Sequence, residues 1–365
     1  MLSARSAGSA LTVVIPGDLD ARTGGYGYDR RIIDGLRQRG WRVDVQRLDD
    51  SFPLPTPAAR AQASGVLAAI PSGSTVVVDG LAFGALPDEA EREAARLRII
   101  ALVHHPLAAE TGLDPALAAA LDVSERRALA ASRSVVVTSR ATADRLADYG
   151  VTADRITVVE PGTDRAPLAR GSSLKSRVSG LSGEVALLCV ATLTPRKGYD
   201  LLLQALAAVP HRHWTLTCAG SLDRDAATVA RVRALLRAES LEDRVVLAGE
   251  MDEATLATYY DRADLFVLPT LYEGYGMAVA EALARGLPVV STATGAIADL
   301  VGADAGIVVP PGDLAALTDA LSRVLGDAEL RARFAAGARR VRDRLPTWDD
   351  AAAAMAQALA REARP

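Results

Sequence analysis

The sequence contains little cysteine. Its two cysteines, Cys189 and Cys218, each lie in an apolar run typical of a buried strand. Neither has metal-ligand spacing with the four histidines, and two thiols build no disulfide framework. A reducing compartment suits such a chain. We therefore expect a cytoplasmic protein without a cysteine-based metal site.

Long apolar runs are also missing. Residues 3–10 are small and polar, unlike the apolar centre of a signal peptide, and no stretch reaches the roughly 18 apolar residues that a bilayer requires. The formal net charge is only -4, which gives no indication of nucleic-acid binding. These absences predict a soluble protein that is at most peripheral to the inner face of the membrane.

Lysine is scarce as well. Of 41 Lys and Arg residues, only Lys175 and Lys197 are lysines. A lysine ammonium is a compact point charge on a flexible stem, whereas an arginine guanidinium is a planar fork. Where a chain otherwise uses arginine, a lysine indicates a place that needs the point charge. This singles out Lys197.

Short β-rich runs alternate with helical patterns along the chain. Its 365 residues favour two domains, at about 150 residues each, and the Ser/Gly-rich stretch 171–183 is the best linker. The alternation predicts a doubly wound parallel sheet in each half. Strands are expected at residues 11–15, 43–48, 75–78, 98–103, 134–138 and 156–159, and, after the linker, at 185–190, 214–218, 245–248, 265–269, 289–292 and 307–309.

Ligands bind beyond the carboxyl ends of strands in open α/β sheets, so the loops that follow the strands are the candidate binding sites. The loop 270–277 precedes a predicted helix and carries two glycines, which would let N–H groups at the helix start approach an anion. Glu273 lies in this loop and Glu281 about one turn into the helix. As an alternative, Glu281 pairs with Arg285 at i,i+4.

Three other loops carry candidate residues. Arg196 and Lys197 precede a predicted helix and could clamp a phosphate, or could belong to an ordinary charged turn. The pair Gly24 and Gly25 follows the first strand, in a loop compatible with dinucleotide binding or with a tight turn. The histidines at 104 and 105 end a strand and should point opposite ways. Without a carboxylate at ligand spacing, we expect no metal there.

Together these loops resemble the retaining glycosyltransferases of family 4, which have the two-domain GT-B fold. Residues 273–281, Glu-Gly-Tyr-Gly-Met-Ala-Val-Ala-Glu, resemble that family's motif of two glutamates separated by seven residues. Residues 194–198 resemble its phosphate-clamp loop, Gly24-Gly25 its glycine pair, and His104 its histidine. The segment from Trp348 onward resembles the helix that returns to the first domain. The resemblance covers nearly the whole chain.

Two positions depart from the family pattern. Thr192 stands where members often carry arginine, so the clamp would rest on Arg196 and Lys197 alone. The turn 294–299 resembles a Gly-Gly-x-x-Glu turn but has Ala296 and Asp299 in place of the second glycine and the glutamate. Phosphate contacts are therefore not assigned to that turn.

The resemblance implies a role for each matching residue. Glu281 would accept hydrogen bonds from the nucleotide ribose, and Glu273 would contact the donor sugar. Arg196 and Lys197 would bind the pyrophosphate, while His104 or His105 would touch the sugar near the reacting carbon. The implied catalytic residues are Glu273, His104, Lys197 and Arg196, and the implied substrate-binding residues are Gly24, Gly25, His105, Gly249, Glu250, Gly274, Tyr275, Gly276, Met277 and Glu281.

The sequence thus predicts an α/β protein with two Rossmann-like, doubly wound parallel-sheet domains that face a cleft. Residues 1–165 would form the acceptor-side domain, 166–345 the nucleotide-sugar domain, and 346–365 a helix packing back on the first. The resemblance implies a metal-independent enzyme that needs no cofactor. It would transfer a hexose, with retention, from a nucleotide-diphosphate sugar as co-substrate to a sugar, lipid or small-molecule acceptor.

Two alternatives stay open. A non-hydrolysing nucleotide-sugar epimerase would need carboxylates acting as acid and base, and the first domain shows no convincing set in sequence. A catalytically silent nucleotide-sugar-binding module is the other alternative. The nucleotide base, the sugar and the acceptor are not identified by these patterns.

Overall fold

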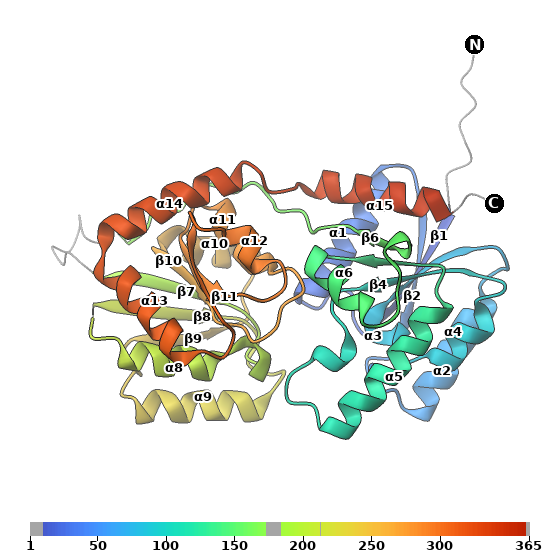
Figure 1. Cartoon of the computed structure of the whole chain (residues 1–365), viewed down its shortest axis with the longest axis horizontal. Coiled ribbons are helices and arrows are strands. Elements are labelled where there is room, and N and C mark those ends of the chain that lie inside the picture. Colours follow the sequence, from blue (N-terminus) through green and yellow to red (C-terminus); the bar gives the residue numbers. More distant parts are fainter. Residues whose placement is uncertain (1–9, 173–183, 212, 363–365) are drawn as a thin grey trace, which may run out of the picture. The chain divides into compact units, whose positions relative to one another are not determined.

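The computed structural model of the protein describes residues 10–172, 184–211 and 213–362 (Figure 1). Most of the predicted linker 171–183, with Lys175, lies outside the described residues. The chain divides into two compact units. The first comprises residues 1–162 and 346–365, and the second comprises residues 163–345.

The first unit is built on a six-stranded parallel sheet with the strand order β2-β1-β3-β4-β5-β6. Successive side chains of a strand point to opposite faces, and both faces of this sheet are covered, because Val13 and Val14 of β1 are both buried. Its strands are β1 (Ala10–Pro16), β2 (Arg42–Leu48), β3 (Thr75–Asp79), β4 (Arg98–Val103), β5 (Ser134–Val137) and β6 (Ile156–Val158).

Helices cover the two faces of the first sheet in separate groups. Val14 packs in a core that α2, α4, α5 and α6 complete, whereas Val13 lies on the face covered by α1 and α15. The helices of this unit are α1 (Gly24–Gln38), α2 (Pro57–Ala69), α3 (Gly80–Phe83), α4 (Pro87–Glu93), α5 (Pro115–Ala131), α6 (Arg140–Ala147) and α15 (Trp348–Glu362), with short 3-10 turns η1 (Leu107–Ala109) and η2 (Ala153–Arg155).

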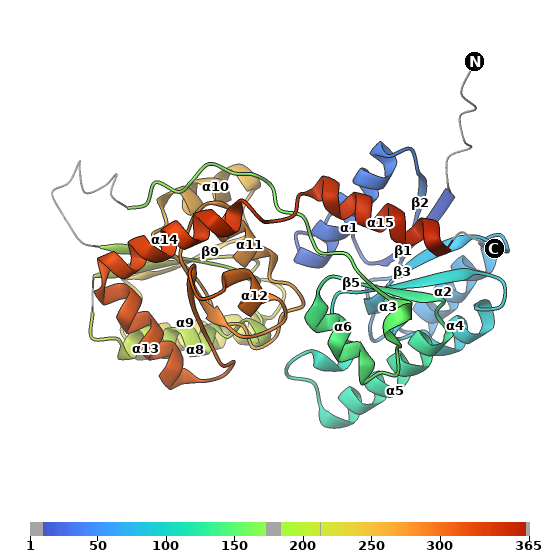
Figure 2. The same cartoon turned by 45° about the horizontal axis from the view of Figure 1, so that its top comes forward.

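The C-terminal helix α15 lies along α1 (Figures 1 and 2). The two helices approach closely at Gly35, where an added Cβ would lie 2.4 Å from the Cβ of Ala352. Arg39 at the end of α1 donates to the Asp349 carboxylate at 2.7 Å. The last helix of the chain is therefore a structural part of the first unit.

The second unit repeats this architecture with the strand order β12-β11-β10-β7-β8-β9, again parallel. Its strands are β7 (Val185–Val190), β8 (Trp214–Ala219), β9 (Val245–Gly249), β10 (Leu265–Leu268), β11 (Val289–Thr292) and β12 (Gly306–Val309). Its helices are α8 (Tyr199–Ala208), α9 (Ala226–Ala238), α10 (Glu253–Arg262), α11 (Met277–Ala284), α12 (Ile297–Val301), α13 (Leu314–Gly326) and α14 (Ala328–Arg342), and η3 (Pro195–Lys197) precedes α8.

Each predicted strand is present, within a residue or so at either end. One local prediction is wrong: Gly24 and Gly25 form the first turn of α1 rather than a loop before it. The helix begins there because the Thr23 hydroxyl accepts a hydrogen bond from the Tyr26 amide and caps the helix start. Among the described residues, none of the helices combines the length and the apolar character that a bilayer crossing requires.

Candidate active site

In the second unit, strands β7 and β10 are neighbours, and their following loops meet at the carboxyl edge of the sheet. The Leu271 amide donates to the Arg196 carbonyl at 2.7 Å, and the Thr270 hydroxyl lies 3.0 Å from the same oxygen. Gly198 follows η3 with φ 69°, and an added Cβ there would lie 2.1 Å from the Pro269 carbonyl oxygen. Only glycine allows this close approach.

The predicted cations and the predicted glutamate come together in these two loops. The Lys197 ammonium forms an ion pair with Oε1 of Glu273. Arg196 donates from Nη1 to the Tyr272 carbonyl at 2.8 Å and lies 3.8 Å from the same Glu273 oxygen. These three side chains are between 13% and 18% exposed, so the charges are shielded from bulk water but remain accessible.

The start of α11 is shaped by glycine. Gly276 caps the helix in the left-handed region, with φ 96°, and an added Cβ would lie 2.8 Å from Cγ1 of Ile297. The loop that contains Gly295 packs closely against the loop of Glu273, because an added Cβ at Gly295 would lie 2.2 Å from the Glu273 carbonyl oxygen. Tyr275 is buried, at 4% exposure. Met277 is the first residue of α11, where amides are not used by the helix itself.

Glu281 lies one turn into α11 and is only partly exposed. The Tyr260 hydroxyl donates to Oε2 of Glu281 at 3.1 Å. Burial and, next, the Glu281 carboxylate raise the pKa of Tyr260, so the phenol keeps its proton and acts as donor. Arg285 donates to the backbone carbonyl of Glu281 at 2.9 Å and stacks over the Tyr260 ring at 4.2 Å. These contacts fix the carboxylate near the loop 270–276.

Gly249 is the last residue of β9 and Glu250 follows it, two strands away from β7 at the same edge. Gly249 has φ 74°, and its carbonyl accepts a hydrogen bond from the Gly220 amide at 2.9 Å. Glu250 is exposed. Both therefore belong to the same edge of the sheet as the Lys197 and Glu273 pair.

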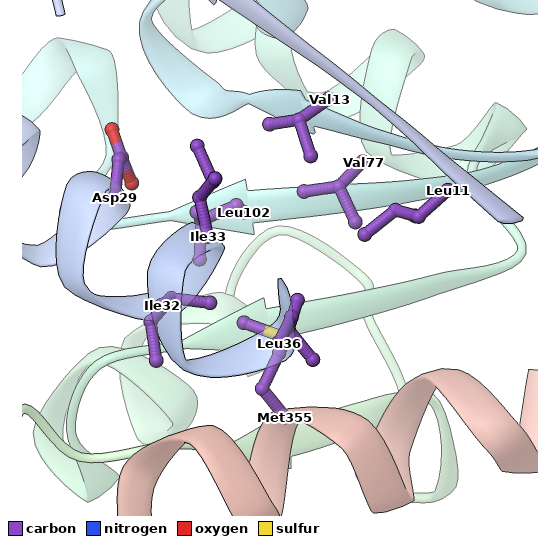
Figure 3. Close-up of a pocket in the computed structure, with 9 residues that line it drawn as sticks. All are labelled: Leu11, Val13, Asp29, Ile32, Ile33, Leu36, Val77, Leu102 and Met355. Atoms are coloured by element: carbon purple, nitrogen blue, oxygen red, sulfur yellow. The ribbon is translucent and has the colours of Figure 1, made fainter. Parts of the chain in front are cut away.

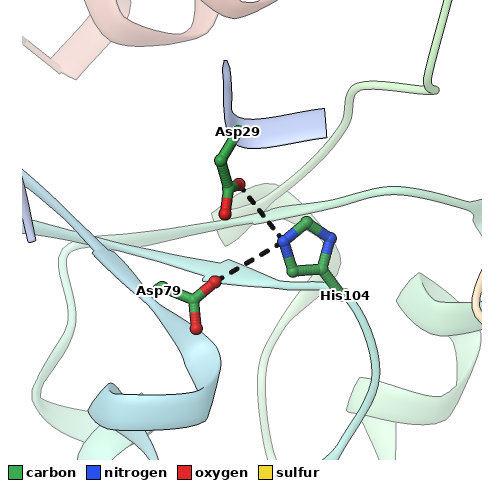
Figure 4. A group of neighbouring side chains, drawn as sticks. All are labelled: Asp29, Asp79 and His104. Atoms are coloured by element: carbon green, nitrogen blue, oxygen red, sulfur yellow. Dashed lines mark ion pairs between the residues drawn. The ribbon is translucent and has the colours of Figure 1, made fainter. Parts of the chain in front are cut away.

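In the first unit, His104 follows β4 and turns toward two carboxylates (Figure 4). Its Nε2 lies 3.3 Å from Oδ1 of Asp29 and 3.5 Å from Oδ2 of Asp79. The Tyr28 ring meets the imidazole edge to face, with 5.4 Å between ring centroids. Gly25 lies beside the same ring, since an added Cβ would be 3.6 Å from Cδ2 of His104.

The two histidines do point to different surroundings. His105 Nε2 lies 3.7 Å from a Glu110 carboxylate oxygen, away from the aspartates that contact His104. No carboxylate stands at ligand spacing from this histidine pair in the sequence, but the fold brings Asp29 from α1 and Asp79 from the end of β3 next to His104. One ligand atom from each of Asp29, Asp79 and His104 lies within 4.8 Å of the others, close enough to surround a cation.

A small cavity of about 20 Å³ lies between the first sheet, α1 and α15 (Figure 3). Apart from Asp29, its lining is apolar and includes Leu36 and Met355. A space of this size holds about one water molecule, which would need two or more polar partners. We interpret the cavity as imperfect packing beside the Asp29 side chain rather than as a ligand pocket.

The fold, two Rossmann-like units with parallel sheets, is shared with solved glycosyltransferases of GT-B fold. A sucrose-phosphate synthase from Thermosynechococcus elongatus superposes with a TM-score of 0.80 at 22% identity, over 97% of this chain and 98% of that one. The Anabaena protein HepE, solved in complex with UDP and glucose, superposes with a TM-score of 0.75 at 17% identity, over 96% and 99%. At these identities the likeness establishes the fold.

Sequence comparison finds glycosyltransferase models and relatives that match this chain. Residues 174–341 match the family model described as glycosyl transferases group 1, and residues 76–166 match glycosyltransferase family 4. A D-inositol 3-phosphate glycosyltransferase of Xylanimonas cellulosilytica is 33% identical over 249 residues, which are 66% of this chain and 59% of that relative. An MMP alpha-(1->4)-mannosyltransferase of Mycolicibacterium hassiacum is 25% identical over 70% of this chain and 63% of its own length. These matches support a glycosyltransferase of the family 4 type, and this chain spans less than two thirds of the length of either relative.

Proposed function

We propose that this protein transfers a hexose, with retention of the anomeric configuration, from a nucleotide-diphosphate sugar to a sugar, lipid or small-molecule acceptor. The observation that carries the proposal is the meeting of Arg196, Lys197 and Glu273 beside the glycine-capped start of α11. The UDP and glucose bound by HepE are consistent with it.

The chemistry explains why these groups belong together. The acceptor hydroxyl oxygen bonds to the anomeric carbon while the bond from that carbon to the phosphate oxygen breaks, and the acceptor proton passes to the leaving phosphate. Positive charge develops on the sugar and negative charge on the diphosphate. Lys197, Arg196 and the amides at the start of α11 would stabilise the diphosphate more strongly in the transition state than in the ground state.

The remaining residues would position the donor. Glu281, held by Tyr260, is placed one turn from the helix start and would accept hydrogen bonds from the ribose hydroxyls. Gly249 and Glu250 would lie near the base, and Glu273 would contact the sugar. We propose that the charge of Arg196 and Lys197 takes the place of a divalent metal ion, so that transfer proceeds in the presence of a chelator.

The test uses the full chain and a panel of UDP, GDP and ADP sugars. A bound donor at 100 times its dissociation constant adds about 2.7 kcal/mol of stability and raises the melting temperature. The stabilising donor is then incubated with candidate acceptors in EDTA, and the anomeric configuration of the product is read by NMR. Absence of both stabilisation and transfer across the panel contradicts the proposal.

The epimerase alternative gains one observation, because Asp29 and Asp79 place two carboxylates beside His104 in the first unit. The same incubations separate the alternatives. An epimerase changes the sugar of the nucleotide sugar without any acceptor, whereas a glycosyltransferase requires the acceptor to form its glycoside. A silent binding module would be stabilised by the donor and release no nucleoside diphosphate.

A further inference from the structure

Two buried carboxylates converge on one imidazole in the first unit. Asp29 is 2% exposed, Asp79 is 5% exposed, and the His104 side chain is 21% exposed. Asp29 comes from α1, Asp79 from the end of β3, and His104 from the loop after β4, so three separate elements build the cluster (Figure 4). Burying two carboxylates is costly unless a positive charge accompanies them.

The cation that faces both carboxylates is His104 itself. Arg30 also acts on Asp29 through its charge, but its guanidinium donates to the carbonyls of Leu19 and Ala21. Tyr28 donates its hydroxyl to the Val159 carbonyl at 3.0 Å and presents only its ring to His104.

Two further residues beside His104 direct their polar groups elsewhere. The Thr138 hydroxyl, after β5, lies 3.5 Å from the His104 backbone carbonyl, and His105 faces Glu110. Both carboxylate oxygens of Asp29 and Nε2 of His104 are buried without a well-formed hydrogen bond. The distance of 3.3 Å between Nε2 of His104 and Oδ1 of Asp29 is that of an ion pair when the imidazole is protonated.

We propose that Asp29 and Asp79 are positioning residues, which keep His104 as a protonated imidazolium and direct its Nδ1–H toward an oxygen of the sugar nucleotide or of the acceptor. The carboxylates occupy the Nε2 side of the ring, and Nδ1 lies on the side that points away from both (Figure 4). This inference rests on the proposed glycosyl transfer. It makes His104 a fixed hydrogen-bond donor and excludes it as a general base.

The electrostatics agree with this geometry. Burial alone lowers the pKa of His104. The charges of Asp29 and Asp79 and their contacts with the ring outweigh burial and raise the pKa to about 10. Burial in turn raises the pKa of Asp29, partly offset by His104. Asp29 has the larger effect on His104, so its neutralisation should lower the pKa of the imidazole more than that of Asp79.

The experiment measures the charge of the ring directly. Two-dimensional proton–nitrogen spectra of the full chain with 15N-labelled histidine distinguish the imidazolium from the neutral imidazole, and His104→Gln identifies the signal. We expect wild-type His104 to keep the imidazolium pattern from pH 6 to about 8.5, well below a pKa of about 10. In Asp29→Asn the His104 signal should titrate between pH 6 and about 8.5. In Asp79→Asn the pKa of His104 should fall by a smaller amount.

Kinetics give a second readout. Above the new pKa, turnover of Asp29→Asn should fall about tenfold per pH unit as the imidazolium is lost, while wild-type turnover shows no such fall in this range. Glu110→Gln is the matched control, because it removes the carboxylate beside His105 and should leave the His104 signal in place.

Three results overturn the inference: a neutral His104 in the wild type at pH 8, an unchanged titration in Asp29→Asn, or a stoichiometric divalent metal in the purified protein that Asp29→Asn loses. The wild-type spectrum alone suffices if Asp29→Asn does not fold. Because the spectra need no substrate, a protonated His104 in a protein that transfers no sugar would contradict the proposed function and leave the charge of His104 established.

Discussion

Lys197 is the side chain whose charge the proposed reaction uses most directly. It is paired with Glu273 at low exposure, so in the ligand-free protein it is held at the place where the diphosphate would bind. We expect Lys197→Ala to weaken the binding of nucleoside diphosphate and intact donor alike. The expected loss is roughly 1.5–3 kcal/mol, as for a hydrogen bond to a charged group, and calorimetry with both ligands measures it.

The only other lysine supplies the control. Lys175→Ala removes the same charge elsewhere in the chain and should leave both affinities as they are in the wild type. Lys197→Arg keeps the charge but replaces a point charge by a planar fork, so we expect an intermediate loss. Equal affinities for wild type and Lys197→Ala would remove Lys197 from the diphosphate site.

Glu273 makes a different prediction at the same scale. Its carboxylate is proposed to contact the sugar and not the nucleotide, and it also balances the charge of Lys197. Glu273→Gln should therefore lower kcat by roughly a hundredfold, equivalent to about 2.7 kcal/mol of transition-state stabilisation, while nucleoside diphosphate binds with nearly wild-type affinity. Glu253→Gln, at an exposed glutamate of α10, controls for charge. Turnover that survives Glu273→Gln would contradict the assignment.

The single residues that sequence patterns miss are those that act through distant partners. Asp29 lies in α1, and no motif in the sequence of that helix marks its carboxylate as different from a surface charge. Its meeting with Asp79 and His104 depends on the packing of α1 against the sheet. The available sequence signal was the position of Asp29 on the same helix face as the apolar residues Ile32, Ile33 and Leu36.

At the scale of elements, the packing of α15 against α1 predicts that an alanine at position 35 destabilises the protein. Helix propensity alone predicts the opposite effect. Alanine normally stabilises a helix interior by up to about 1 kcal/mol over glycine. At Gly35, however, the added Cβ would lie 2.4 Å from the Cβ of Ala352. We expect Gly35→Ala to destabilise the protein by roughly 1–3 kcal/mol, as overpacking does, measured by chemical unfolding.

Two variants test the cause. Gly65→Ala lies inside α2, where an added Cβ meets nothing within 4 Å, and it should be neutral or stabilising. Adding Ala352→Gly to Gly35→Ala removes the clashing methyl group, so the double variant should regain part of the loss despite the poorer helix propensity of glycine. A loss that is the same with and without Ala352→Gly would show that the clash is not its cause.

Strands were predictable from the sequence for a physical reason, whereas the positions of several glycines were not. Strands of a doubly wound parallel sheet are buried on both faces and read as short apolar runs, which is why β1 and β7 were recognised with their boundaries nearly correct. The start of α1 was misplaced, because Gly24 and Gly25 suggest a loop unless the capping Thr23 is given more weight. Gly295 was also missed, since its close approach to Glu273 is a tertiary contact.

At the scale of the whole molecule, each of the two units supplies one part of the proposed machinery. The second unit holds the cationic loop, Glu273 and Glu281 on one edge of its sheet, and the first unit holds the His104 cluster at the corresponding edge of its own. The paired glutamates and the loop 194–198, together with Gly24-Gly25, His104 and the segment from Trp348 onward, gave the resemblance to family 4. The acceptor is not encoded in any comparable pattern, because acceptor contacts depend on loops whose sequences follow no fixed spacing.

The stability of the whole chain should depend on pH through Glu125. This residue of α5 is 1% exposed, and its Oε2 accepts a hydrogen bond from the Leu107 amide at 2.8 Å. Burial raises the pKa of Glu125 to about 8, although the Leu107 hydrogen bond opposes the shift. Between its usual pKa and about 8, the folded protein holds one proton more than the unfolded chain at this site, so stability falls as pH rises through this window.

Glu125→Gln isolates this contribution, since glutamine keeps the shape and cannot ionise. The free energy of unfolding of Glu125→Gln minus that of the wild type should increase by on the order of 2 kcal/mol between pH 6 and pH 8. Chemical unfolding at each pH measures this difference. Glu329→Gln, at an exposed glutamate of α14, should follow the wild type across the same range. A constant difference between Glu125→Gln and wild type would mean that the Glu125 carboxyl group is already ionised at pH 6 in the folded protein.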